Sequence, residues 1–198
     1  MKRIFTALVL LCFALSLSAQ SIIVTSGSLD FLRGEKVFYF TYTYNDMTVG
    51  KMTESEYVKK KKSEYNEKEP GRGDKWEQAW IDDRQNRFEP KFEELFMKQL
   101  EKKNIYLGKD QANYRFVFNT DFTEPGYNVG VWRGNAFIDL TCTIVNVASG
   151  EQVATIKIRK SPGRDALGAD FDTGFRIQEG YAKAGKEFAK FLLKKAKL

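Results

Sequence analysis

The strongest constraint on the fold is a strict alternation of apolar and polar residues after position 135. In residues 136–144 every second side chain is apolar, and Asp139, Thr141 and Thr143 stand between them. Residues 153–160 repeat the pattern after a short turn at Gly150. A period of two indicates half-buried strands, and a short turn joins antiparallel neighbours. The sequence therefore predicts an antiparallel pair with one face in the core.

Two more segments show the same period. Residues 114–122 place aromatic side chains and Thr120 at one parity, which predicts a further strand of an antiparallel meander. Residues 37–44 carry four aromatic rings at one parity and Val, Tyr and Thr at the other. This first strand is therefore expected to be apolar on both faces, as a central strand is.

Two helical segments lie near the ends of this pattern. Residues 53–69 begin with a capping box formed by Thr53 and Glu56, and they contain strong helix formers with few apolar anchors, which predicts a solvated helix. The last helix, near the carboxyl terminus, has a single apolar stripe. That stripe consists of Ile177, Tyr181, Ala184, Phe188, Phe191 and Leu192.

Another helix is predicted over about residues 75–103. Trp76 and Trp80 lie one turn apart and begin an apolar face that continues along the segment. Pro90 lies inside this helix, and because proline has no amide hydrogen it must kink the helix or split it into two pieces.

The tripeptide Arg72–Gly73–Asp74 stands just before that helix. The same tripeptide occurs in cell-adhesion ligands, but Asp74 followed by Glu77 also forms a capping box. A capping carboxylate accepts the amide hydrogens of the first turn and is not free for a partner. We therefore expect Asp74 to be a helix cap.

These elements define an α+β fold. The expected architecture is an antiparallel, or mixed, four-stranded sheet with helices packed on one face, in the order β-α-α-β-β-β-α. Residues 20–198 have the length of one domain and can bury one core.

The amino terminus has the pattern of a secretory signal peptide. Lys2 and Arg3 precede an apolar run, and small residues follow it up to Ala19, so we expect residues 1–19 to be removed. The remaining chain, residues 20–198, has no apolar stretch long enough for a membrane span. The predicted location is the periplasm or the extracellular space.

No lipid anchor is expected, because the residue before Cys12 is Leu11, whereas lipoprotein processing needs a small residue there. The net charge of +6 falls to +4 without the signal peptide, and the charges are interleaved along an exported chain. Nucleic acid is therefore not an expected partner.

Several chemistries are absent from the sequence. The chain has no histidine, which excludes Ser-His-Asp and Cys-His catalysis, and Cys142 has the parity of a buried, inert thiol. Asp170, Asp172 and Gly174 are similar to the opening of a calcium loop, but the bidentate glutamate of such a loop is missing. We predict a protein that is not an enzyme and has no cofactor and no metal site.

Two segments, SGSLDFLRGEKVFYFTYTYNDMTVGKMTESEY (residues 26–57) and GRGDKWEQAWIDDRQNRFEPKFEELF (residues 71–96), resemble an uncharacterised family of exported Bacteroidetes proteins. That resemblance implies export and no known activity. The segment TCTIVNVASGEQVATIKI (residues 141–158) is similar in topology to envelope domains such as the curli secretion lipoprotein and the amino-terminal domain of TolB. It implies a cell-envelope setting, although a fold does not fix a function.

Five residues are candidates for ligand or partner binding. Aromatic and arginine side chains on loops give large contact areas, and this favours the loop at residues 124–135. The five candidates are Tyr127, Trp132 and Arg133 in that loop, together with Trp76 and Trp80 on the helix.

Three functions remain open. The favoured one is a non-enzymatic module that binds another envelope protein or itself. The alternative is a carrier of a small apolar or glycan ligand, held between helices and sheet by Trp76, Trp80 and sheet aromatics. A hydrolase that brings Asp121 and Asp139 together has no positive support in the sequence.

Overall fold

The computed structural model describes residues 20–129, 132–163 and 172–198, with residues 128, 129, 132 and 133 described by their backbone alone. The signal peptide predicted for residues 1–19 lies outside the described residues, as does Asp170. Within the described ranges, no helix combines the length and apolar character needed to cross a bilayer.

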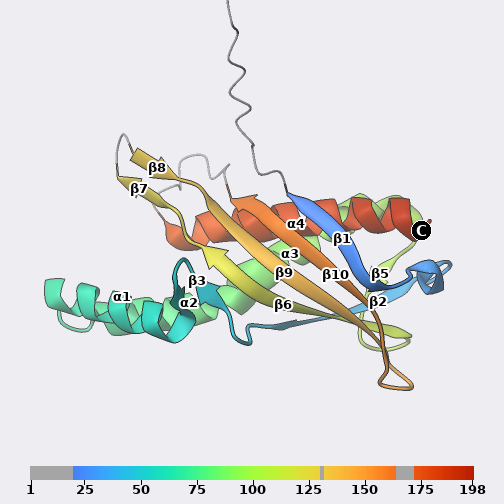
Figure 1. The fold of residues 1–198 in the computed structure, drawn as a ribbon, viewed down its shortest axis with the longest axis horizontal. Coiled ribbons are helices and arrows are strands. Elements are labelled where there is room, and N and C mark those ends of the chain that lie inside the picture. The colour runs from blue at the N-terminus through green and yellow to red at the C-terminus, as the bar shows by residue number, and fades with distance from the viewer. Residues whose placement is uncertain (1–19, 130–131, 164–171) are drawn as a thin grey trace, which may run out of the picture.

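The protein has an α+β fold built on a mixed sheet, as predicted (Figure 1). The prediction of four strands is wrong, because the described residues form an eight-stranded sheet and a separate two-stranded one. The large sheet has the order β1-β10-β9-β6-β2-β5, and the short β3 pairs with β6 and with the short β4. Its strands are β1 (Ser21–Gly27), β2 (Val37–Thr43), β3 (Thr48–Val49), β4 (Met52–Thr53), β5 (Tyr106–Leu107), β6 (Tyr114–Glu124), β9 (Ala136–Asn146) and β10 (Gln152–Gly163).

Strands β6, β9 and β10 form the predicted antiparallel meander. Strand β2 instead runs parallel to β6, from Phe38 opposite Tyr114 to Thr43 opposite Asn119. A parallel pair needs a long crossover connection, and here the helices between β2 and β6 supply it. The element order differs from the predicted β-α-α-β-β-β-α, because β1 precedes β2, a third helix, α3, lies between β2 and β6, and short strands flank these elements.

Strand β1 was not predicted. It pairs antiparallel with β10 and forms one edge of the sheet, where Ile23 and Val24 are exposed. Most of its side chains face solvent on both sides of the strand. Its burial therefore has no period of two that an alternation of apolar and polar residues could reveal.

The second, two-stranded sheet also corrects a prediction. Residues 124–135, expected to be a loop, contain the antiparallel hairpin of β7 (Tyr127–Val129) and β8 (Trp132–Gly134).

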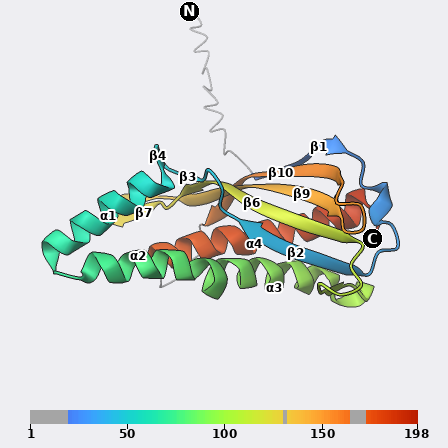
Figure 2. The same ribbon diagram turned by 90° about the horizontal axis from the view of Figure 1, so that it is seen from below.

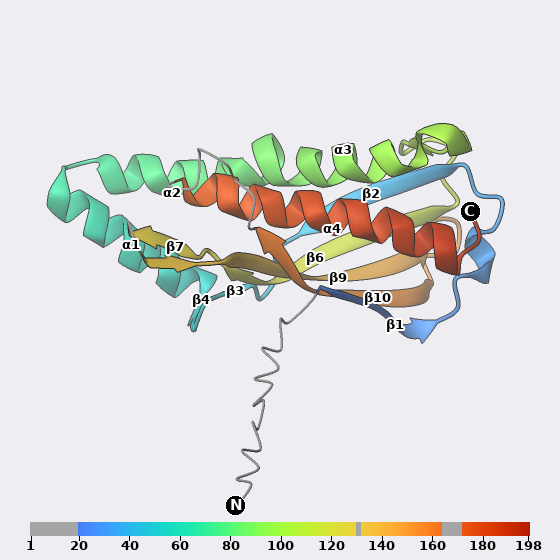
Figure 3. The ribbon, with the colours of Figure 1, turned by 90° about the horizontal axis from the view of Figure 1, so that it is seen from above.

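The long helices are α1 (Glu54–Lys68), α2 (Arg72–Asp83), α3 (Glu89–Leu100) and α4 (Thr173–Lys195), with short helical turns η1 (Asp30–Leu32), η2 (Arg84–Phe88) and η3 (Glu101–Lys103). Figure 3 shows α3 and α4 side by side on the same face of the sheet. Within the described parts of the chain, no helix covers the opposite face, and α1 folds back along α2 at one end of the molecule (Figure 2). The prediction of helices on one face is thus correct for α3 and α4.

The helix predicted over residues 75–103 is divided near Pro90 into α2 and α3, with the π-helical turn η2 between them. The chain passes from α2 through the π-helical turn η2 into α3, and Pro90 stands in the first turn of α3. The wider turn gives the Glu89 amide a partner in the Arg84 carbonyl. An early position in α3 suits a residue that has no amide hydrogen to donate.

The core lies between the sheet and the helices α3 and α4. Phenylalanine rings from both layers meet there, for example Phe92 and Phe118 with centroids 4.7 Å apart, and Phe118 and Phe188 at 5.3 Å. The residues of the last-helix stripe are buried, except for the half-buried Phe191. Packed aromatic side chains therefore fill the space between the two layers.

Helix α1 begins as predicted, with a capping box between Thr53 and Glu56. The predicted cap at Asp74 is wrong. Helix α2 already begins at Arg72 with Gly71 before it, and the Asp74 carboxylate forms an ion pair of 2.8 Å with Lys62 of α1. Asp74 is therefore used to join two helices and not to close the end of one.

Candidate functional site

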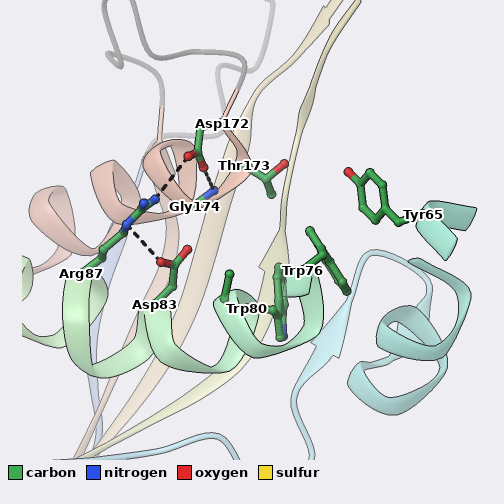
Figure 4. Close-up of a pocket in the computed structure, with 9 residues that line it drawn as sticks. Tyr65, Trp76, Trp80, Asp83, Arg87, Asp172, Thr173 and Gly174 are labelled. Atoms are coloured by element: carbon green, nitrogen blue, oxygen red, sulfur yellow. Dashed lines mark hydrogen bonds and ion pairs between the residues drawn. The ribbon is translucent and has the colours of Figure 1, made fainter. Parts of the chain in front are cut away.

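An open cleft of about 470 Å³ lies where α1, α2, η2 and the start of α4 meet (Figure 4). One side is aromatic and the other is polar and charged. The lining residues are Tyr65, Trp76, Ala79, Trp80, Asp83, Arg87, Asp172, Thr173 and Gly174.

The aromatic side is positioned by the close approach of α1 and α2. A Cβ atom at Gly73 would overlap the Lys62 carbonyl oxygen, so only glycine allows this contact. The Gly73 amide donates to Asn66 Oδ1 at 2.7 Å, which fixes the two helices in register. This approach brings the ring of Tyr65 to 5.7 Å from the ring of Trp76.

The two tryptophans differ in their environments. They stack with ring centroids 5.6 Å apart, but Trp80 is only 7% exposed and its Nε1 donates to Glu54 Oε1 at 2.6 Å. Arg84 pairs with the same carboxylate. Trp76 is half-buried, and among the described residues neither its Nε1 nor the hydroxyl of Tyr65 has a hydrogen-bond partner. Trp80 is thus an anchor, whereas the half-buried Trp76 lines the cleft.

The polar side is centred on Arg87. Its Nε lies 3.0 Å from Asp83 Oδ1, and its Nη1 lies 3.4 Å from Asp172 Oδ2. Asp172 also caps α4, because its Oδ1 accepts from the Gly174 amide at 2.7 Å. Burial raises the pKa of the Asp83 carboxyl group, an effect that Arg87 opposes. The arrangement ties η2 to the first turn of α4.

A second cleft of about 440 Å³ adjoins the first. Tyr65, Trp76 and Thr173 line both. We call the combined surface the aromatic groove. Its second half is lined by Val49, Gly50, Lys51, Met52, Tyr57, Lys60, Lys61, Glu124, Pro125, Gly126, Tyr127 and Arg176.

Three of the five predicted site residues meet in the aromatic groove: Trp76, Trp80 and Tyr127. Tyr127 is 52% exposed and packs over Gly134, its partner across the β7–β8 hairpin. Trp132 and Arg133 lie on β8, opposite Val129 and Asn128, and their side chains are outside the description. The proposal that they bind a partner stays a prediction.

Two other predicted arrangements differ from the structure. The phenylalanines of the large sheet that face α3 and α4 belong to the filled core and are not among the residues that line the cleft with Trp76 and Trp80; they include Phe38, Phe40, Phe116 and Phe118. Asp121 and Asp139 do approach each other, but both pair with Arg159, at 2.7 and 3.7 Å. They are therefore neutralised by an arginine on the helix-free face of the sheet.

Three residues of the groove were not predicted as site residues: Tyr65, Asp83 and Arg87. Tyr57 and Tyr65 lie eight positions apart on one helix, and this spacing could have indicated an aromatic face on the helix that was described as solvated. Asp83 and Asp172 both contact Arg87, but they lie far apart in the chain, and no pattern in the local sequence indicates that they share a partner. No group of three or more metal-binding side chains is found in the part of the chain that the structure describes.

A second polar cluster lies beside η2, outside the aromatic groove. The hydroxyl groups of Tyr42 and Tyr44 donate to Glu93 and Glu89, each at 3.2 Å. The guanidinium of Arg84 stacks on the Tyr44 ring at 4.1 Å. Burial raises the pKa of both carboxyl groups, and hydrogen bonds from the tyrosines oppose this effect.

No protein-family model and no curated protein matches the chain. Two crystal forms of the PelC dodecamer from Paraburkholderia phytofirmans are similar at 15% and 16% identity, with TM-scores of 0.39 and 0.37. Both matches cover 85% of this chain, and they cover 95% and 96% of the PelC chain. A Xanthomonas campestris protein with the family model DUF330 is similar at 8% identity and a TM-score of 0.39, over 82% of this chain and 85% of that one. At such low TM-scores and identities, the role of the site has to be inferred from its own geometry.

Proposed function

We propose that the protein is a non-enzymatic module of the cell envelope, exported by its signal peptide, that binds a partner in the aromatic groove. The observation that carries this proposal is the contrast between the two tryptophans. Trp80 is buried and hydrogen-bonded, whereas Trp76, stacked on it, is half-buried and lines both clefts of the groove. A large aromatic side chain held rigidly at a surface is typical of a binding site.

The packing of the molecule supports a surface site. Rings from the sheet and the helices fill the interior, so a ligand would sit in the open groove and not between the layers. The carboxylates that line the groove near Arg87 are engaged in an ion pair and a helix cap, which suits a binding role more than acid–base chemistry.

Photo-cross-linking in the native organism tests this function. A photoreactive amino acid at Ala79, which lines the groove, should give a specific adduct. The same amino acid at Gln78, an exposed neighbour on α2 that does not line the groove, is the control. Adducts of equal yield at both positions, or none at Ala79, would contradict the proposal.

Export is tested separately. The full chain should fractionate with the envelope or the medium, and its mature form should begin at Gln20 by mass spectrometry. A chain that starts at Gln20 from its own initiator methionine should stay in the cytoplasm. Retention of the full chain in the cytoplasm would refute this part of the proposal.

Self-association is a second candidate, and the edge of the sheet favours it. Among the described strands, β1 pairs only with β10, and Ile23 and Val24 are 50% and 37% exposed along this edge. An edge strand with exposed apolar side chains can pair with a second copy. Light scattering of residues 20–198 should then show an oligomer that Ile23→Lys reduces to monomer.

A further inference from the structure

We propose that the Trp76 end of the aromatic groove binds a sugar ring of a neutral oligosaccharide. This inference rests on the proposed function, since it names the chemistry of the partner that the groove accepts. It follows from three properties of the described residues: a supported aromatic face, planar polar groups beside it, and a groove that continues beyond them.

The aromatic face is rigid. Trp80 stacks behind Trp76 at 5.6 Å with an interplanar angle of 29°, and Tyr57 and Tyr65 flank Trp76 at 6.0 and 5.7 Å. The π face of an indole is electron-rich and attracts weakly positive C–H groups. One side of a pyranose ring presents a row of such C–H groups, so it complements the part of the Trp76 side chain that lines the cleft.

The polar groups suit hydroxyl groups. An ionised carboxylate has about four lone-pair sites and a guanidinium has five N–H groups. The Arg87–Asp83 contact at 3.0 Å and the Arg87–Asp172 contact at 3.4 Å use only part of this capacity. Vicinal hydroxyl groups donate and accept at the same time, so they can pair with both members of such an ion pair. The Trp76 Nε1 and the Tyr65 hydroxyl add two groups without partners among the described residues.

Other ligand classes fit less well. An apolar ligand would remove water from Arg87 and its two carboxylates without replacing their hydrogen bonds, which is costly. At the Trp76 end, a multivalent anion would be repelled by the carboxylates of Asp83 and Asp172, which outnumber the one guanidinium of Arg87. A strongly cationic peptide would meet Arg87 in the same place. A neutral ligand with many hydroxyl groups meets none of these penalties.

The length of the groove favours an oligosaccharide over a single sugar. The groove continues past Tyr65 and Trp76 to the exposed ring of Tyr127, with Glu124 and Thr173 along the way. The basic residues Lys51, Lys60, Lys61 and Arg176 also line this half. Lys60 and Lys61 are within ion-pair distance of Glu64, and Arg176 donates to the Pro125 and Gly126 carbonyls. A linear oligosaccharide could therefore contact Trp76 with one ring and Tyr127 with a later one.

The test uses residues 20–198 and neutral linear hexasaccharides of glucose, mannose, galactose and N-acetylglucosamine. Binding is followed by calorimetry and tryptophan fluorescence. At least one hexasaccharide should bind, and Kd should change less than twofold between 0.05 and 0.5 M NaCl because the ligand is uncharged. Trp76→Leu should weaken binding at least tenfold, and Gln78→Ala, on the same helix but outside the groove, should leave it unchanged.

Tyr65→Leu is a second variant that keeps the test valid if Trp76→Leu does not fold, and it should also weaken binding. If no hexasaccharide binds while the Ala79 cross-link persists, the partner is a polypeptide and this inference is wrong, although the proposed function stands. If both the cross-link and the binding fail, the proposed function is wrong as well. Binding that survives Trp76→Leu and Tyr65→Leu, or that salt abolishes, would also overturn the inference.

Discussion

Gly185 of α4 packs directly on the backbone of Phe92 in α3. A Cβ atom at Gly185 would overlap the carbonyl oxygen of Phe92, so the two helices approach to backbone contact at this point. Gly180, five residues earlier on α4, has more room, since its Cβ atom would lie 3.4 Å from Ile138 Cγ1. Of these two buried glycines, the packing of the helix requires glycine at Gly185 and leaves room for a methyl group at Gly180.

Gly185→Ala should lower the free energy of unfolding by about 1–3 kcal/mol or more, because α3 and α4 must move apart. Gly180→Ala should be neutral or stabilise by up to about 1 kcal/mol, since alanine favours the helical backbone over glycine. Urea unfolding of both variants measures the difference. Equal effects would show that the contact with Phe92 does not control the helix spacing.

The buried carboxyl group of Glu93 should make the protein less stable as the pH rises. Burial raises its pKa in the folded state above the unfolded value. Between these two pKa values, the folded state holds a proton that the unfolded state has lost. The contribution of this group to the free energy of unfolding is therefore fully present below the unfolded pKa, and it is lost as the pH rises through the folded pKa. Glu93→Gln should abolish this component and keep an acceptor for the Tyr42 hydroxyl.

The pH experiment compares unfolding free energies between pH 4 and pH 7. Relative to the wild type, Glu93→Gln should be more stable at pH 7 than at pH 4. Glu94→Gln is the matched control, because its exposed carboxylate pairs with Lys91 at 2.9 Å, and it should follow the wild-type pH dependence. A constant difference between wild type and Glu93→Gln at all pH values would contradict the prediction.

The Glu54 carboxylate accepts a hydrogen bond from Trp80, the buried member of the stacked pair Trp76 and Trp80. Glu54→Ala removes the partner of Trp80 Nε1 and of Arg84 together, and should cost about 1–3 kcal/mol of unfolding free energy. Glu64→Ala, which breaks exposed ion pairs on the same helix, should cost less than about 1 kcal/mol. Thermal or urea unfolding distinguishes the two; a similar loss in both variants would argue against a special role for Glu54.

Cys142 is fully buried on β9, and burial raises the pKa of its thiol well above the usual range. A thiol-specific reagent should therefore leave the folded chain beginning at Gln20 unmodified at neutral pH, and should modify one thiol per chain in urea. Rapid modification of the folded protein would show that β9 opens in the native state.

The elements that could be predicted from the sequence are those with one buried face and one exposed face. In β9, Ile138, Leu140 and Ile144 are buried and alternate with partly exposed residues, so the period of the sheet is visible in the sequence. The stripe on α4 is visible for the same reason, and the Thr53–Glu56 capping box is a contact between near neighbours in the chain.

Elements defined by distant contacts were not predictable in this way. The alternation in β2 does not tell whether its neighbour runs parallel or antiparallel, and β1 faces solvent along most of its length. In the groove, Trp76 and Trp80 were visible as a pair one turn apart. Asp172 reaches Arg87 only because α4 lies against η2, a contact between residues 85 positions apart.

The pairing of β1 with β10 also governs the order in which the molecule can assemble. Ser21 lies opposite Arg159, and Phe38 of β2 lies opposite Tyr114 of β6. Contacts between such distant parts of the chain close large loops and form slowly. The meander β6–β9–β10 joins neighbouring segments and is expected to form first, with β2 and β1 added to its two sides afterwards. A ribosome therefore completes most of the chain before its first strand has a place in the sheet.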